Sequence, residues 1–402
     1  MFTNIIAFFL VFIPFFCWMG WGDGIRAPKE TATVISLAVI GMVGFYRFQI
    51  KSINRYFLLF IVWCTATLFF SNYAIKVFLE NGVMSLPSNL IAYKSLLYIV
   101  LAVLAIGAIS SSNIDLKKIS KIISIVCLVM SIYSILQFAG FDEWFRVADP
   151  NTGWVGNALW DKSDPNKWGH FSRRIVGTLG NPSILGIFLS FCLPFQLLCK
   201  NKLGYVSFAL SLIIIALTIS LTAYFITIVS LLFILFFKNK KVSILILAAL
   251  ILSFFALTKT PLYNKVKFMV NPTGRIEMYK ESFNLLYKKA ITGYGLGSFE
   301  YLVGRNPEVI NKLKGEMWRE AHNEYFQIWF ETGIIGLILF LLGIFKTFRD
   351  FLKTTQNEMV YITSSFLGFL ISAMTYFPMR ISPLSLYGVV IFGLLTKGER
   401  NG

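Results

Sequence analysis

The feature that most constrains the fold of this chain is a series of long apolar runs. They cover Ile5–Met19, Val34–Tyr46, Tyr56–Phe70, Ile91–Ile109, Ile122–Phe138, Ile184–Cys199, Tyr205–Leu217, Ala223–Phe237, Val242–Leu257, Gly333–Phe345, Val360–Met374 and Leu384–Leu395. A membrane-spanning helix needs roughly 20 apolar residues, and flanking Ser, Thr, Gly and aromatic residues extend the runs towards that length. Only 14% of the 402 residues are charged, against about 25% in soluble proteins. We therefore expect an all-α, polytopic membrane protein with about 12 transmembrane helices, forming one integral membrane domain over residues 1–402.

The net charge of +17 raises the question of a nucleic-acid partner, but the distribution of the charges answers it. If the N-terminus is cytoplasmic, the short inner loops carry Arg47, Lys51, Arg55, Lys117, Lys118, Lys121, Lys200, Lys202, Lys238, Lys240, Lys241, Lys346, Arg349, Lys353, Lys397 and Arg400. The short outer loops carry only Arg26, Lys29, Lys76 and Arg380. Basic residues concentrate in cytoplasmic loops of membrane proteins. The distribution of charge thus predicts that the N-terminus is cytoplasmic, and it does not indicate a nucleic-acid partner.

The first run and the cysteines have simple interpretations. Ile5–Met19 has no charged leader and is followed by Gly20–Gly24, so we interpret it as the first spanning helix rather than a removed signal peptide. The five cysteines, Cys17, Cys64, Cys127, Cys192 and Cys199, all lie in apolar segments or at their ends. We therefore expect the cysteines to be small packing residues, and not parts of a disulfide framework or a metal cluster.

Two outer segments are much longer than the other loops: about 140–173 and about 259–332. Long connections in compact proteins are usually functional or disordered. These two carry both histidines and most of the tryptophans: Trp144, Trp154, Trp160, Trp168, His170, Trp318, His322 and Trp329. The tryptophans fit either an interfacial belt or packing against the apolar faces of sugar rings. We expect the second segment to form a large external helical loop that carries the chemistry.

Within that second segment the pattern predicts short helices and turns. From Arg275 to Ala290, apolar residues recur at helical spacing, which predicts an amphipathic helix. Gly293–Gly297 ends it and lacks the spacing of a dinucleotide-binding loop. Glu316–Glu331 is expected to be helical and to lead directly into the next span, so that Trp318 and Phe326 lie one turn either side of His322.

His322 and Asn323 are the most conspicuous polar pair, just before a span on the predicted outer face. An interfacial histidine that satisfies a hydrogen bond is one interpretation. The other is a general base, or an orienting group, for a hydroxyl nucleophile, for which an unperturbed pKa near 6.5 is suited.

Two arginines, Arg174 and Arg275, form the second feature. Arg174 precedes Gly177-Thr-Leu-Gly-Asn-Pro182, where the glycines and Asn-Pro predict a disturbed helix of the kind that lines a cavity. Arginine matches phosphate oxygens bidentately, so a diphosphate clamp is one interpretation, and snorkelling to headgroups is the other. Arg173 and Arg380 are weaker candidates for the same role.

Metal chemistry and transport are the competing alternatives. Asp161 and Asp164 are the nearest approach to an acidic pair, and two distant histidines do not make a transition-metal site. A Mg²⁺ site from scattered carboxylates stays open; we favour a mechanism with no metal and no cofactor. A transporter would use intramembrane ionisable residues, for which Lys76 and Lys94 are the main candidates.

Together these residues resemble the O-antigen ligase and O-antigen polymerase family. His322-Asn323, nine residues, then Gly333-Ile-Ile-Gly336 is similar to its H-N-x9-G-x-x-G block. Arg174–Pro182, including Gly177, and Thr273-Gly-Arg275 followed by Gly293–Gly297 resemble its two other blocks. The layout of spans, with a large external loop late in the chain, also fits.

The resemblance implies a membrane glycosyltransferase of the bacterial inner membrane, with its active site facing the periplasm. Its donor would be a glycan on undecaprenyl diphosphate, and its acceptor lipid A–core for a ligase or a lipid-linked glycan for a polymerase. In this interpretation Arg174, Arg275 and Arg173 hold the diphosphate, His322 accepts or orients the acceptor proton, and Asn323 helps to place it. Transfer would be inverting and metal-independent. If His322 only orients, Glu320 or Glu324 is the base. The complete His-Asn block favours a ligase.

Overall fold

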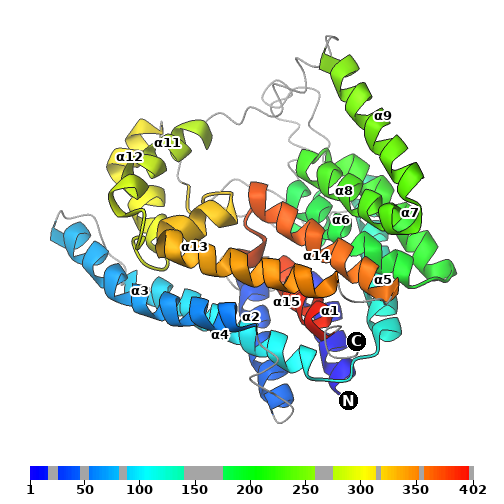
Figure 1. Cartoon of the computed structure of the whole chain (residues 1–402), viewed down its shortest axis with the longest axis horizontal. Coiled ribbons are helices and arrows are strands. Elements are labelled where there is room, and N and C mark those ends of the chain that lie inside the picture. Colours follow the sequence, from blue (N-terminus) through cyan, green and yellow to red (C-terminus); the bar gives the residue numbers. More distant parts are fainter. Residues whose placement is uncertain are drawn as a thin grey trace.

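The computed structural model describes residues 1–16, 26–45, 54–80, 88–139, 175–258, 275–313, 318–352 and 357–397. Every regular element in these ranges is helical (Figure 1). The longer helices are α1 (Phe2–Phe15), α2 (Arg26–Gly44), α3 (Arg55–Glu80), α4 (Ser88–Ser110), α5 (Leu116–Phe138), α6 (Pro182–Leu198), α7 (Lys202–Thr218), α8 (Leu221–Lys238), α9 (Lys240–Thr258), α11 (Arg275–Leu286), α13 (Glu324–Phe351), α14 (Asn357–Thr375) and α15 (Ser382–Lys397). The shorter ones are η4 (Gly177–Leu179), η5 (Tyr287–Lys289), η6 (Glu300–Gly304), α12 (Pro307–Lys312) and η7 (Pro378–Arg380).

Each of the predicted apolar runs falls on one of these helices, wholly or for most of its length. Five helices in the described ranges are long and apolar enough to cross a membrane: Ile91–Ser110, Leu116–Phe138, Leu221–Lys238, Glu324–Phe351 and Asn357–Thr375. Five more are apolar but shorter, between 10 and 17 residues. The all-α class is confirmed for the described ranges. The count of about 12 spans and the external loop stay predictions.

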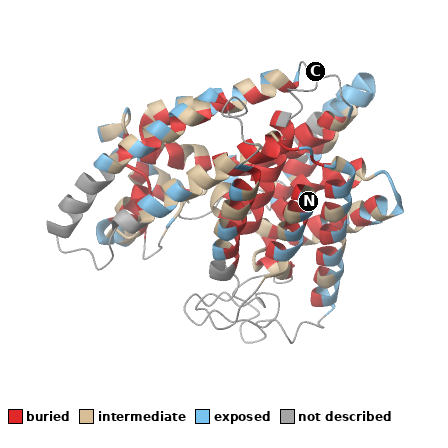
Figure 2. Ribbon diagram, turned by 90° about the horizontal axis from the view of Figure 1, so that it is seen from below, coloured by how far each residue is buried: buried red, intermediate tan, exposed pale blue. Residues whose placement is uncertain are grey.

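Helix α6 lies at the centre of the bundle. It contacts α5, α7, α8 and α14, and 14 of its 17 residues are buried. A helix that is apolar on all sides is stable where protein or lipid covers every face, and the burial of α6 shows that protein neighbours cover it. Small residues allow close approach, because a Cβ on Gly186 would lie 2.8 Å from the Ala223 Cβ. Buried residues gather in the interior of the bundle and exposed ones on its outer faces (Figure 2).

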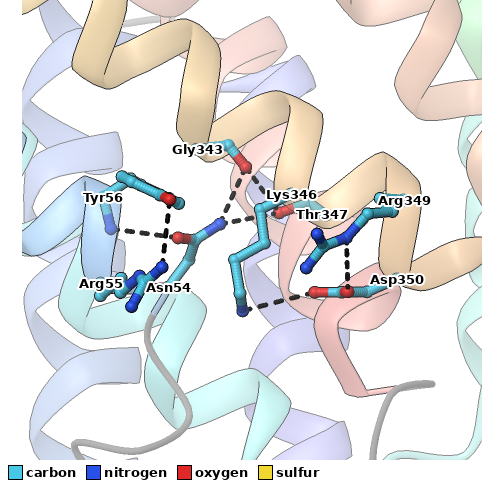
Figure 3. A network of polar contacts seen from close by, with 8 residues as sticks. All are labelled: Asn54, Arg55, Tyr56, Gly343, Lys346, Thr347, Arg349 and Asp350. Atoms are coloured by element: carbon cyan, nitrogen blue, oxygen red, sulfur yellow. Dashed lines mark hydrogen bonds and ion pairs between the residues drawn. The ribbon is translucent and has the colours of Figure 1, made fainter.

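Described helix ends next to two loops predicted on the inner side lie side by side. The beginning of α3 meets the end of α13, where Asn54 Nδ2 donates to Gly343 O at 2.8 Å (Figure 3). Lys346 and Arg349 lie at this same end and both pair with Asp350 (Figure 3). These contacts agree with the predicted grouping of the basic loops.

Helix α13 crosses the molecule, and α11 and α12 gather near its N-terminal end (Figure 1). A second, smaller core holds this region together. It is built from Met278, Leu286, Phe299, Val303, Val309, Leu313, Ala321 and Phe330. The fold therefore packs the segment 275–313 directly against the part of α13 that follows His322 and Asn323.

Candidate active site

A break in α13 at Gly333 organises the candidate site. Gly333 has φ 68° and ψ −179°, a conformation essentially open only to glycine. A Cβ at this position would lie 2.1 Å from the Ile291 carbonyl oxygen. Gly336, one turn further on, faces Trp63, whose Cδ1 would lie 3.2 Å from an added Cβ. The two motif glycines therefore have structural roles, a backbone break and a close helix contact.

The glycine-rich loop 293–297 fills this break. Tyr294 N donates to Phe330 O at 3.0 Å, and Gly295 N donates to Glu331 O at 2.7 Å. In return, Ile334 N, which lies just after the break, donates to Ala290 O at 2.9 Å. Gly293, Gly295 and Gly297 all have positive φ, which allows the tight turns that this docking needs. The loop thus satisfies backbone groups that the break removes from the helical ladder.

His322 lies in front of α13 and not within it. The expected helix over Glu316–Glu331 is wrong in its first half, because α13 begins at Glu324 and the described residues before it, from Trp318, are not helical. His322 has φ 51°, in the left-handed region, where non-glycine residues cluster at functional sites. This turn places the imidazole among three aromatic rings. Their centroids lie 5.2 Å (Trp318), 5.4 Å (Tyr376) and 4.9 Å (Phe377) from its own.

Asn323 is the N-cap of α13. Its Oδ1 accepts a hydrogen bond from Phe326 N at 3.0 Å, which satisfies one of the N–H groups that a helix leaves free at its start. The backbone of Asn323 also contacts Gln327, whose N donates to Asn323 O at 3.0 Å. Asn323 therefore fixes where the helix begins and, with it, the position of His322.

Helix α11 brings Arg275 to His322. The helix is confirmed close to its predicted bounds. Tyr279, one turn after Arg275, ties the helix to the His322 segment by donating from its hydroxyl to Ala321 O at 2.8 Å. Its ring also packs on Phe326, with centroids 5.3 Å apart. Phe326 therefore contacts α11 rather than His322.

The buried side of α11 differs from the one its apolar spacing indicates. Met278, Ser282 and Leu286 are buried, whereas Ile276 and Phe283 are about half exposed. The helix therefore buries the side that carries Met278, Ser282 and Leu286, while Phe283 packs against Trp329 with ring centroids 6.1 Å apart.

His322 and Arg275 each carry a buried nitrogen without a partner. Neither His322 Nδ1 nor Arg275 Nε has a hydrogen-bond partner among the described residues. Buried polar atoms are normally paired, so such exceptions need an explanation. The pKa of His322 is lowered to about 4, first by burial and second by the nearby positive charge of Arg275. The imidazole is therefore neutral at physiological pH and able to accept a proton.

A buried ion network lies directly behind His322. Arg380 Nε lies 3.1 Å from Glu324 Oε1, and Arg380 Nη2 lies 3.1 Å from Glu331 Oε2. Gln327 continues the network, because its Nε2 donates to Glu331 Oε1 at 3.0 Å and its Oε1 accepts from Ala321 N at 3.0 Å. The network connects η7 to the backbone next to His322. Arg380 thus pairs with two carboxylates, and Glu324 is bound to Arg380.

Arg380 and Glu324 are separate candidates in the sequence, which does not indicate that they form an ion pair. The available signal was chemical: Glu324 and Glu331 both begin an apolar span, and carboxylates there need a nearby cation. Glu324 and Arg380 are 56 residues apart, and spacing within one sequence does not indicate which cation it is.

The block from Gly177 to Pro182 forms η4 and the first residue of α6, with a left-handed backbone at Gly177 and Gly180. The residues before 175 lie outside the description, so the predicted break stays a prediction. Asn181 caps α6 by accepting from Ser183 N and Ile184 N, and Pro182 takes its first position, where proline costs no hydrogen bond. Gly177 has φ 56°, and its N–H donates to Gln137 Oε1 at 2.9 Å. Before α6, Thr178 O accepts from the buried Lys29 Nζ.

This block lies at the same end of the bundle as the ion network. Ser382 Oγ donates to the backbone oxygen of Lys29, and Ser382 lies two residues after Arg380. Contacts thus run from Thr178 through Lys29 and Ser382 towards Arg380. Arg173 and Arg174, the aspartates Asp161 and Asp164, and His170 lie outside the described residues, so their placement stays a prediction.

The residues named for the transport and metal alternatives are described only in part. Lys94 is exposed and lies 3.3 Å from Glu30, so it does not line an interior pathway; the side chain of Lys76 falls outside the description. Within the same ranges, no three His, Cys, Asp or Glu side chains gather into a potential metal site.

Comparison with known proteins links this geometry to one family. Residues 206–341 match the O-antigen ligase family. The matched range begins in α7 and ends within α13, so it contains Arg275, the glycine loop, His322, Asn323, Gly333 and Gly336. The block 174–182 lies outside it. The resemblance is therefore confirmed over that range, in which the chain is similar to O-antigen ligases.

Two curated relatives are named as polysaccharide ligases. A protein of Rickettsia felis is 42% identical over 78 residues, and one of Rickettsia conorii is 41% identical over 78 residues. Each match covers 18% of this chain and 18% of the relative. The matched part of the chain therefore covers less than a fifth of the length of either relative.

Proposed function

We propose that this protein is an O-antigen ligase that transfers a glycan from undecaprenyl diphosphate to a sugar hydroxyl of lipid A–core. The observation that carries the proposal is the pair of unpartnered buried nitrogens, His322 Nδ1 and Arg275 Nε, inside the range that matches the family. One is a neutral base and the other belongs to a fixed cation. Such a pair suits the transfer of a group from a diphosphate to a hydroxyl.

In this mechanism the acceptor hydroxyl lies against His322. The imidazole accepts the hydroxyl proton as the oxygen attacks the anomeric carbon, which is general base catalysis. The bond between the anomeric carbon and the diphosphate oxygen breaks, and the electron pair leaves with undecaprenyl diphosphate. Attack opposite the leaving group inverts the anomeric centre. No metal or cofactor takes part.

Arg275 would stabilise the charge that develops on the leaving diphosphate. Electrostatic contacts directed at developing charge are among the largest contributions to catalysis, roughly 3–4 kcal/mol for one donor. Arg174 and Arg173, which precede the η4 block, would complete the clamp. Asn323 would act through the helix cap that fixes His322. The site would face the periplasm, across the inner membrane from the basic loops.

Glu324 is the alternative base, because its Oε2 is buried without a hydrogen-bond partner among the described residues. Its Oε1 is held by Arg380 at 3.1 Å, so a proton on this carboxyl would weaken a buried ion pair, whereas His322 lies near Arg275, the proposed diphosphate ligand. We therefore assign the base role to His322, and the role of Glu324 to the support behind it.

The test is glycan transfer by the purified protein with EDTA present, using undecaprenyl-diphosphate glycan and lipid A–core. His322→Ala and Arg275→Ala should each lower transfer by at least a hundredfold, while Lys280→Ala, on an exposed position of α11, should leave it unchanged. Equal melting temperatures of all variants would exclude misfolding.

Three other outcomes would change the assignment. Growth of the lipid-linked glycan with no core product would make the protein a polymerase, which uses the same chemistry. Loss of activity in EDTA that Mg²⁺ restores would overturn the metal-independent mechanism. Absence of both products, with the donor bound normally, would reject the enzyme and favour a transporter.

A further inference from the structure

A cavity of about 460 Å³ lies at the end of the bundle remote from His322. Its walls come from the first turn of α5, the connection between α6 and α7, and Glu358 in the first turn of α14. His322 packs on Tyr376, which follows the other end of α14. Helix α14 has 19 residues, so roughly 28 Å of helix separates the cavity from the candidate active site.

The cavity is positively charged. Lys117, Lys121 and Lys200 line it, with Glu358 as the single acidic lining residue. None of the four forms an ion pair with another described residue, and the three lysines are exposed. Unpaired lysines around a hollow attract an anion.

Helix ends add to this charge. Helices α5, α7 and α14 all begin at the cavity, with Lys117 and Glu358 in first turns and Asn201 as the N-cap of α7. The N-terminal end of a helix carries a partial positive charge and favours a bound anion. Ser120 and Asn201 supply further polar groups at the wall.

The position of the cavity indicates where the anion comes from. Helices α5 and α14 are both long and apolar enough to cross a membrane, so their common end lies where lipid headgroups lie. Leu116 and Leu198 line the same cavity beside the lysines. A ligand with a phosphate next to hydrocarbon would match both kinds of wall, and basic pockets between spanning helices bind anionic headgroups in this way.

We propose that this cavity binds the phosphodiester headgroup of an anionic phospholipid. The inference goes beyond glycan transfer and does not depend on it, because it uses a separate set of residues at the other end of the molecule. The shared chemistry is a phosphate oxygen held by lysines, and the experiment separates a lipid phosphate from a free one.

The test measures lipid binding to the purified full-length protein by native mass spectrometry. The probes are phosphatidylglycerol, phosphatidylcholine and inorganic phosphate. We expect tight binding of phosphatidylglycerol only. The triple variant Lys117→Gln, Lys121→Gln, Lys200→Gln should weaken this binding at least tenfold, since each lysine near a membrane surface adds to the attraction for anionic lipid.

A matched control separates the cavity from general surface charge. Lys238→Gln, Lys240→Gln and Lys241→Gln remove the same charge from another loop predicted on the same face, and should leave the tight binding in place. Equal loss in the two triple variants would overturn the proposal. Equally tight binding of inorganic phosphate would show a free-phosphate site and would also overturn it.

Glu358→Gln gives a second test that does not rely on loss of binding. The change removes the acidic wall residue, so phosphatidylglycerol should bind more tightly, by about threefold or more. Misfolding cannot produce tighter binding. An unchanged or lower affinity in a variant with the wild-type melting temperature would contradict the cavity as the binding place.

Discussion

The imidazole of His322 is kept neutral by its surroundings. Aromatic rings cover it, Arg275 lies nearby, and its pKa is lowered to about 4. A base needs the neutral form, so transfer should stay constant from pH 8 down to about pH 5 and fall as the pH passes through 4. Rates measured across this range with saturating donor provide the check. A fall centred near 6.5, the value of a solvated histidine, would contradict the buried position.

The same lowered pKa has a consequence for stability. Above pH 6.5 neither the folded nor the unfolded state protonates this histidine. Between 6.5 and 4 the unfolded state binds the proton and the folded state does not, so the free energy of unfolding should decrease as the pH falls. Melting curves of the wild type and His322→Gln should diverge in this window. His170→Gln serves as the matched control for the other histidine.

The Arg380 network allows a prediction about single and paired changes. Arg380→Gln would leave Glu324 and Glu331, both almost fully buried, without their cation. Removing one member of a buried pair costs about 3–5 kcal/mol, and we expect the lower end because 26% of the Arg380 side chain is accessible. Adding Glu331→Gln should recover part of the loss. Thermal unfolding in one detergent measures both, and a double variant that is less stable than Arg380→Gln would contradict the network.

At the level of residues, the candidate polar groups were easier to find in the sequence than the contacts behind them. His322, Asn323 and Arg275 are distinctive because polar groups are rare beside apolar spans, and the described structure brings all three together. The pairing of Arg380 with two carboxylates depends on the way α13 and η7 meet in space. Local pattern contains no information on that contact.

Among the elements, the break in α13 explains why two glycine motifs occur together. Gly333 provides a backbone conformation that other residues avoid, and loop 293–297 supplies the missing hydrogen bonds. Gly333→Ala should lower stability by at least 1–2 kcal/mol from its left-handed backbone alone, and more because the Cβ would overlap Ile291 O. Melting temperature and transfer should both fall.

Gly41→Ala is the matched control for this change. A Cβ on Gly41 in α2 would meet Leu104 Cβ at 3.6 Å, an ordinary contact, and alanine favours a helix by about 1 kcal/mol over glycine. We expect a melting temperature equal to or above that of the wild type. If Gly333→Ala behaved in the same way, the role assigned to the break would be wrong.

Helix positions followed from the sequence better than helix starts. Apolar runs predicted the positions of the helices because periodicity and length are local properties. The start of α13 was predicted several residues too early, because the stretch before Glu324 contains good helix formers while the contacts of His322 hold it in a left-handed turn. The Asn181-Pro182 pair shows a similar ambiguity, since the same residues that break a helix also begin one.

For the whole molecule, the unequal distribution of basic residues predicts the side on which each loop lies. A contact between two helix ends agrees with the grouping, because Lys118 Nζ in the first turn of α5 donates to Asn4 Oδ1 in the first turn of α1 at 2.7 Å. The candidate active site lies at the opposite end of α14 from the basic cavity. If the basic end is cytoplasmic, Arg275 and His322 must lie on the periplasmic side.

Cysteine labelling tests this orientation directly. In a variant whose five native cysteines are replaced by serine or alanine, a single cysteine is placed at Lys280 in α11 or at Lys202 at the start of α7. Both positions are exposed, so accessibility depends on the membrane alone. In intact spheroplasts a membrane-impermeant maleimide should modify the cysteine at 280 and leave the one at 202 unmodified, and lysis should make both reactive. The reverse pattern would invert the orientation and place the proposed chemistry on the cytoplasmic side, where an outward-facing glycan donor is out of reach.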